Sequence, residues 1–167
     1  MLNIAAFTFK YDHIEDRILM VGNLNNDQQR VDFWLTRKLV LRLLSAASGL
    51  IEKTSSDIAG APVQLKSDLA QFHHESARQG LQVEPEDEDL KAENASLLCR
   101  LDVSHQSGRY RILFFVNDES PLAASVLTYD ELHQMLHLIH HGSLALDWGA
   151  DPQLFATEVS SSSVTLQ

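Results

Sequence analysis

The chain has 167 residues, of which 44% are hydrophobic and 22% charged, and its formal net charge is −10 at pH 7. This size suits one domain with a core of its own, and the composition argues against disorder. One cysteine excludes an intramolecular disulfide, and the acidic balance disfavours binding to nucleic acid or to an anionic membrane.

The N-terminal segment gives no sign of targeting. Met1 to Lys10 has no basic leader ahead of its apolar residues, and polar residues interrupt them. No later stretch is long and apolar enough to span a bilayer. We therefore expect a soluble protein of the cytoplasm.

The first third of the chain has the pattern of three strands and a helix. Alternating or continuous apolar residues predict strands over 3–11, 17–23 and 30–36. Thr36 can cap the helix that follows, in which apolar residues recur at helical spacing as far as Ile51.

Residues 52–93 form a connector of different character. A modest helix is predicted over 63–78, with Leu65, Leu69 and Phe72 on one side. An acidic loop follows over 84–93, where six acidic residues face one lysine. Such a charge run is typical of a solvated loop.

The second ordered block again shows three strands and a helix, with strands predicted over 95–104, 109–117 and 122–127. In the first of these, Cys99 is expected to be buried on one face with Leu97, Leu101 and Val103. Thr128 to Glu131 is a capping box for a helix that runs to His141, where Gly142 is placed to stop it. Residues 151–167 are predicted to be a frayed tail.

The two blocks correspond in the order of their elements. The fold class that this predicts is α+β: a single domain over 1–150, built from two β-β-β-α units that form antiparallel sheet packed against the helices. The internal repeat spans 2–51 and 94–144 and gives the domain a pseudo-two-fold axis. The two meanders join into one sheet or stack as two, and a chance likeness between generic meanders is the alternative.

Particular residues set the register of the repeat. Arg17 is matched with Arg111, because an asparagine follows each arginine after six residues, and Thr36 is matched with Thr128. On this alignment Leu43 and Leu136 occupy corresponding core positions.

Four histidines gather on the last helix. The apolar stripe of that helix lies about 145° from them, so they should point to water or to a partner. Imidazoles one turn apart can chelate zinc or another transition metal, although no HExxH glutamate is present. A polar helix face that is rich in imidazole is the other interpretation. The candidate metal ligands are His133, His137, His140 and His141.

No other motif indicates a catalytic centre, so an enzyme is not favoured, and no cofactor beyond a transition metal is expected. The first hypothesis is a non-enzymatic protein that contacts another protein, most simply a second copy of itself, through exposed aromatics at Trp34 and Tyr110. Metal or ligand binding by the histidine helix is the second. Single-stranded nucleic-acid binding on a sheet face rich in arginine is the third, disfavoured by the acidic charge.

Overall fold

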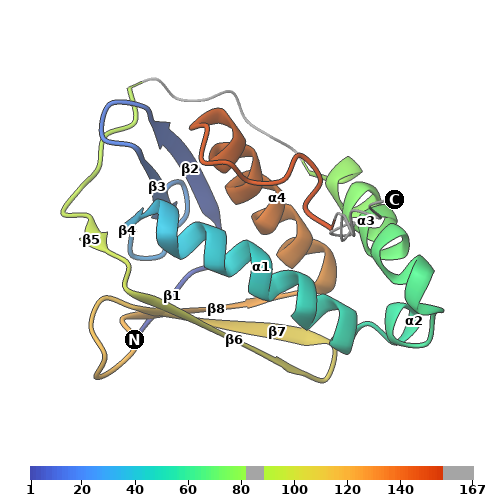
Figure 1. The fold of residues 1–167 in the computed structure, drawn as a ribbon. Coiled ribbons are helices and arrows are strands. Elements are labelled where there is room, and N and C mark those ends of the chain that lie inside the picture. The colour runs from blue at the N-terminus through green and yellow to red at the C-terminus, as the bar shows by residue number, and fades with distance from the viewer. Residues whose placement is uncertain (82–88, 156–167) are drawn as a thin grey trace.

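The computed structural model describes residues 1–81 and 89–155 (Figure 1). Each group of strands is followed by helices in the order that the sequence predicts, with two short extra strands and one short extra helix. The strands are β1 (Leu2–Asn3), β2 (Phe7–Asp12), β3 (Arg17–Gly22), β4 (Val31–Leu35), β5 (Ser96–Leu97), β6 (Arg100–Gln106), β7 (Arg109–Phe115) and β8 (Ala123–Leu127). The helices are α1 (Arg37–Thr54), α2 (Ser56–Ala59), α3 (Val63–Gln79) and α4 (Tyr129–Ala145).

The strands form two separate four-stranded sheets, in the orders β2-β3-β4-β5 and β1-β8-β7-β6. Three strands of each sheet are an antiparallel meander, and the short fourth strand adds in parallel to the last strand of the meander. The α+β class with two β-β-β-α halves is therefore confirmed.

Each half gives its first strand to the sheet of the other half. Leu98 donates its backbone N–H to β4, and the next residue, Cys99, donates to β7 in the other sheet. In the first half, Ile4 donates to β8, whereas Ala6 accepts from Asn23 at the end of β3. Ile4 and Leu98 are buried where the chain crosses between the sheets. The two halves thus exchange their first strands, β1 and β5.

Strand pairing fixes the register of the repeat. Ile18 pairs with Leu35 in the first sheet, and Tyr110 pairs with Leu127 in the second. Each leucine directly precedes the threonine that caps its helix. The halves therefore correspond at a constant offset of 92 residues from β3 to the end of the helix.

Two details of the predicted alignment are wrong. At this offset Arg17 corresponds to Arg109 rather than Arg111, and Leu43 corresponds to Met135 rather than Leu136. The reason is that the length difference between the repeats lies in the first hairpin, where β2 and β3 are joined by four residues and β6 and β7 by two. The second turn has the same length in both when it is measured between paired residues, from Gly22 to Val31 and from Phe114 to Ala123.

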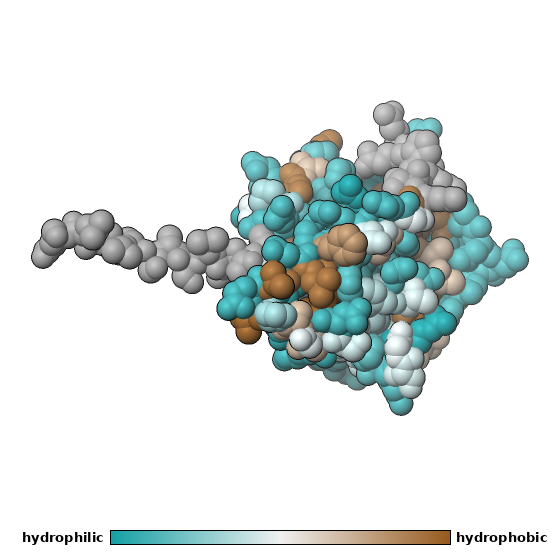
Figure 2. All heavy atoms as spheres, turned by 90° about the vertical axis from the view of Figure 1, so that its right-hand side faces the viewer, coloured by the Kyte–Doolittle hydropathy of each residue, from teal (hydrophilic) through white to brown (hydrophobic). Residues whose placement is uncertain are grey.

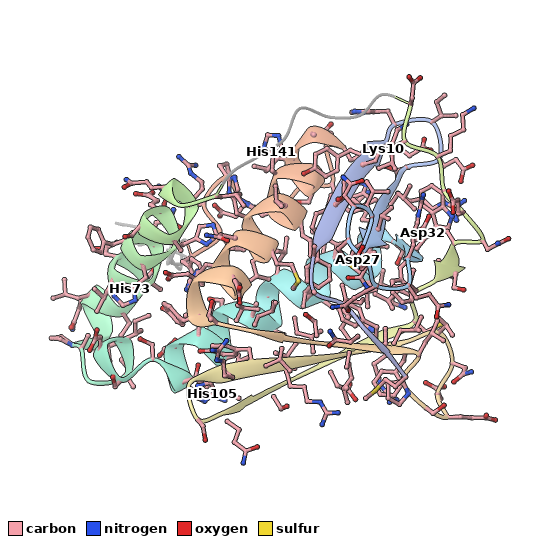
Figure 3. All side chains as sticks on the ribbon, turned by 180° about the vertical axis from the view of Figure 1, so that it is seen from behind. Lys10, Asp27, Asp32, His73, His105 and His141 are labelled. Atoms are coloured by element: carbon pink, nitrogen blue, oxygen red, sulfur yellow. The ribbon has the colours of Figure 1, made fainter. Side chains whose placement is uncertain are left out.

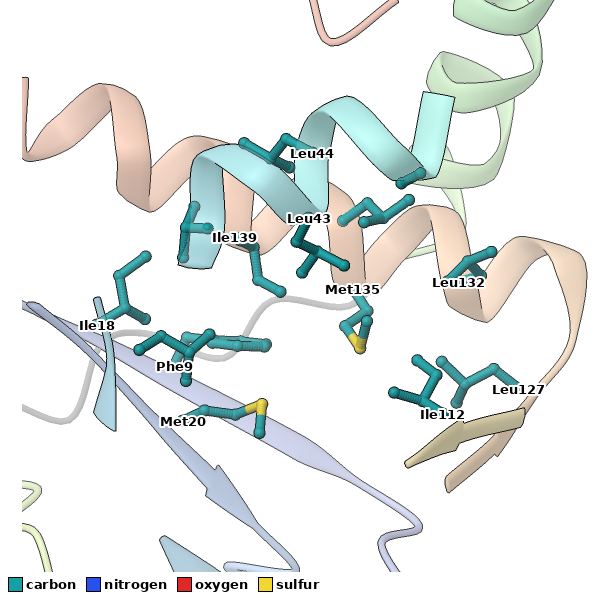
Figure 4. Packing of buried hydrophobic residues seen from close by; sticks show 14 of the residues in the cluster. Phe9, Ile18, Met20, Leu43, Leu44, Ile112, Leu127, Leu132, Met135 and Ile139 are labelled. Carbon is teal, nitrogen blue, oxygen red and sulfur yellow. The ribbon is translucent and has the colours of Figure 1, made fainter. Parts of the chain in front are cut away.

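The core lies between the sheets and the helices α1 and α4 (Figure 4). Each helix also reaches the other half, because α4 contacts β2 and α1 contacts β6. The side chains that meet there are aliphatic, aromatic and thioether groups, among them Phe9, Met20, Leu43, Ile112 and Met135. Within the described residues, no helix is both long and apolar enough to cross a bilayer.

Cys99 is exposed, not buried. The alternation of side chains is interrupted where the strand passes from one sheet to the other, so Leu98 faces inward while Leu97 is 50% exposed. The predicted strand over 95–104 is in fact two strands, and a pattern read through the crossing places Cys99 on the wrong face.

Gly142 lies inside α4 and does not end it. A Cβ atom there would collide with the ring of Tyr11, whose hydroxyl donates to the carbonyl of Leu138 at 2.7 Å. The body of the protein also continues past residue 150. Phe155 is buried, so the first residues of the predicted tail pack against the domain. Residues 156–167 of that tail lie outside the described residues.

Candidate functional site

The histidine face of α4 does not point to water. His133 is fully buried, His140 is 7% exposed and His137 is half-buried, whereas His141 is exposed. The predicted angle between the two stripes of the helix is compatible with this, because α3 and the segment around Phe155 cover the second stripe. The expectation of a solvated face is therefore wrong.

The centre of this contact is a pair of imidazoles. His74 of α3 is 3% exposed, and its Nδ1 lies 3.0 Å from Nδ1 of His133. One of these nitrogens donates and the other accepts, since both rings are neutral when buried. Nε2 of His133 is buried and has no hydrogen-bond partner among the described residues. The two imidazoles thus share one hydrogen bond, and a second buried nitrogen of the pair has none.

Burial sets the protonation state of the cluster. It lowers the pKa of His74 to about 3, helped by the neighbouring His133 and His137. Burial likewise lowers the pKa of His133 to about 4 and that of His137 to about 4, with Arg78 also disfavouring charge on His137. All three imidazoles are neutral at pH 7.

The remaining histidines of the two helices are engaged at the edges of this contact. Nε2 of His140 lies 2.6 Å from the carbonyl oxygen of Asp151, and Nδ1 of His73 lies 2.9 Å from the hydroxyl of Tyr129. Figure 3 shows His73 on α3 and His141 near the far end of α4. In residues 1–81 and 89–155, no group of three or more His, Cys, Asp or Glu side chains is arranged to hold a metal ion.

Helix α3 carries its large apolar side chains outward. Its buried stripe is small or polar, with Ala70, His74 and Ala77 against α4. On the opposite side, Leu65 is 54% exposed and Phe72 is 65% exposed. Leu69 is half-buried between them. We call Leu65, Leu69 and Phe72 the α3 seam; Figure 2 shows hydrophobic atoms gathered on this side of the molecule.

Beside the buried stripe, a groove of about 270 Å³ runs between α1 and α3. Its lining mixes polar and apolar groups and includes the ion pair of Lys66 with Glu52, at 3.4 Å. The lining residues are Ser48, Glu52, Val63, Lys66, Ser67, Ala70 and Phe155. The acid and the base of this lining, Glu52 and Lys66, pair with each other.

The two aromatic residues expected at an interface lie elsewhere. Tyr110 is 1% exposed and directs its hydroxyl to Thr54 Oγ1 at 2.6 Å, so it is a core residue. Trp34 is half-buried beneath the guanidinium of Arg17, 4.4 Å from the ring centroid. Phe9 also faces the core. Tyr110 and Phe9 are therefore not on an outer sheet face, where stacking of single-stranded bases would require them.

No family model, no characterised protein and no solved structure matches this chain. Function must then be inferred from the surfaces themselves. The sequence already shows the spacing of the α3 seam on one side of the helix, but it does not show which side of the helix faces α4. Only the small size of the residues on the opposite stripe, Ala70 and Ala77, indicates that α3 approaches its neighbour by that face.

Proposed function

We propose that the protein acts through protein–protein contacts and associates with a second copy of itself through the α3 seam. The observation that supports this is the orientation of α3. This helix buries alanine and histidine side chains and leaves Leu65 and Phe72 exposed to solvent. Large apolar side chains grouped on one helix face are typical of interaction surfaces.

The spacing within the seam suits a helix pair. Leu65, Leu69 and Phe72 follow one another at intervals of four and three residues, the repeat with which helices pack side by side. Covering Leu65 and Phe72 in both copies removes four side chains from water. At about 1.5 kcal/mol each this is on the order of 6 kcal/mol before the cost of association.

Sedimentation velocity over a concentration series tests the proposal. The protein should dimerise, and Phe72→Glu should weaken the dimer at least 100-fold, since burying an unpaired charge is added to the lost apolar contact. Ile14→Glu is the matched control, because Ile14 is 97% exposed in the turn between β2 and β3. A protein that stays monomeric at several hundred micromolar, or equal weakening by both variants, would refute self-association through α3.

Metal binding is the second candidate. It is favoured by His137 and His141, one helical turn apart with ring centroids separated by 6.2 Å, beside the ring of His74. Native mass spectrometry of protein purified without chelator, with and without added zinc, tests this. A stoichiometric zinc ion that His137→Gln abolishes would support it, and binding only at a large excess of zinc would count against it.

A further inference from the structure

The outer face of the first sheet is covered by another part of the chain, whereas the outer face of the second sheet is exposed. On the first sheet, residues 89–95, which we call the strap, cover the face turned away from the helices. Leu90 packs there against Leu19 and Val21, beside Trp34. A hydrophobic slot on this sheet is therefore filled by the chain's own connector.

Hydrogen bonds and an ion pair with side chains of the first sheet hold the strap in place. Lys10 Nζ donates to the carbonyl of Leu90 at 2.7 Å, and Arg30 donates to the carbonyl of Lys91 and the carboxylate of Glu93 at 2.8 Å. The fully buried carboxylate of Asp32 accepts from the Glu93 amide at 2.7 Å. Figure 3 shows Lys10 and Asp32 on this sheet. The cations of the sheet thus bind carbonyl and carboxylate oxygens of an extended segment.

The repeat places a corresponding surface on the second sheet, but with different side chains. Arg30 and Asp32, which hold the strap, correspond to Leu122 and Ala124. Lys10, which pairs with Leu19, corresponds to Ser104, which pairs with Arg111. At the offset of 92 residues, the paired Leu19 and Trp34 correspond to the paired Arg111 and Val126, and Val21 corresponds to Leu113. Their inward neighbours on β7 are buried, so these side chains point to the outer face. No described segment covers them: Arg111 is exposed, Val126 is 54% exposed and Leu113 is half-buried.

The charge of this face is opposite to that of the protein as a whole, because three arginines, Arg100, Arg109 and Arg111, lie on it with one carboxylate. That carboxylate, Asp102, lies opposite Leu113 and pairs with Arg100 at 3.2 Å. Arg109 and Arg111 are exposed at one end of β7, and within residues 1–81 and 89–155 neither has an ion pair. Beside them lies the apolar patch of Leu113, Leu122 and Val126. An occupant must therefore offer carboxylates next to an aliphatic side chain.

We propose that the outer face of β6, β7 and β8 binds an extended acidic segment of a partner protein, held by the arginines of this face and not by counterparts of Lys10, Arg30 and Asp32. One aliphatic side chain of the segment packs on Val126 and Leu113, and its carboxylates meet Arg109 and Arg111. The bound segment has the composition of the strap and of the acidic run that precedes it in the sequence. This surface is separate from the α3 seam and does not depend on self-association.

The chain itself supplies the probe. A labelled peptide of residues 86–95 (EDEDLKAENA) carries the leucine and the acidic residues in the required order. It should bind the full-length protein, with amide shifts in NMR spectra confined to β6–β8, and should bind at least tenfold more weakly to Arg111→Glu. Arg42→Glu, on the exposed side of α1, changes the net charge equally and should leave binding unchanged. The same peptide with serine in place of leucine should lose most of its binding.

Three outcomes would overturn the proposal. These are the absence of binding at millimolar peptide, equal weakening by Arg111→Glu and Arg42→Glu, and shifts confined to the first sheet, where the peptide would be exchanging with the strap. Phe72→Glu should bind the peptide as the unmodified protein does. A failure of self-association through α3 is therefore distinguishable from a failure of this site.

Discussion

Acidification should loosen the contact between α3 and α4. The pKa values of His74, His133 and His137 in the folded protein, about 3, 4 and 4, lie below the ordinary value of 6.5. The unfolded or detached state therefore binds more protons than the folded state. The stabilising contribution of neutral imidazoles is complete above pH 6.5 and is lost as the pH falls from 6.5 towards 4.

Each buried histidine with a lowered pKa costs about 1.4 kcal/mol of stability for each pH unit in that window. His74 and His133 are almost completely buried and count in full, whereas the half-buried His137 counts for about half. An unfolded imidazole is already half protonated at pH 6.5, so each fully counted histidine contributes about 1 kcal/mol over the first unit below it. The free energy of unfolding should then fall by about 2.5 kcal/mol between pH 6.5 and pH 5.5, a large share of the stability of an ordinary domain. Among the described residues, no carboxylate raises the pKa of these three imidazoles, and Arg78 lowers the pKa of His74 and His137.

Urea titrations at half-unit pH intervals measure the slope, and limited trypsin digestion reports where the structure opens. Cleavage after Lys66 and Arg78 in α3 should accelerate below pH 6 before global unfolding, because releasing α3 exposes all three imidazoles. His74→Gln, which cannot be protonated, should flatten the slope by about 1.4 kcal/mol per pH unit or more. A stability that is constant between pH 7 and pH 5, or an unchanged slope in His74→Gln, would refute the explanation.

Two further predictions concern particular positions. Gly142→Ala should destabilise the protein by about 1–2 kcal/mol in thermal or urea unfolding, because the crowding against Tyr11 outweighs the gain in helix propensity; Gly49→Ala, in open space on α1, should be neutral or stabilising by up to about 1 kcal/mol. Cys99 should react completely with a thiol reagent within minutes in the absence of denaturant, since its side chain is exposed; labelling that requires urea would contradict the placement of the strand crossing.

Local patterns predict the elements of this fold well. Periodicity finds the six long strands, and the threonine caps of α1 and α4 mark where both helices begin, with hydrogen bonds from Leu39 to Thr36 and from Glu131 to Thr128. The element order also reveals the repeat. These features depend on neighbours in sequence, which a single chain displays directly.

Contacts between distant segments were not predictable in the same way. The exposure of Cys99 depends on the crossing of the chain between the two sheets. The burial of Tyr110 depends on α1, whose Thr54 contacts the tyrosine hydroxyl. The burial of His133 depends on α3 and Phe155, which are far from it in sequence. Polar residues on a second helix stripe look solvated until the covering segment is known, and for that reason the histidine contact was missed.

The reciprocal exchange of β1 and β5 has a consequence for how the molecule holds together. Each half alone would lack one strand of its sheet and would leave a raw edge on β4 or β8. A cut within residues 82–88 would therefore yield two fragments, neither of them an independent domain, that complete each other only when both are present. The chain has the arrangement of a strand-swapped dimer whose subunits are joined end to end, with a linker long enough for its last residues to serve as the strap.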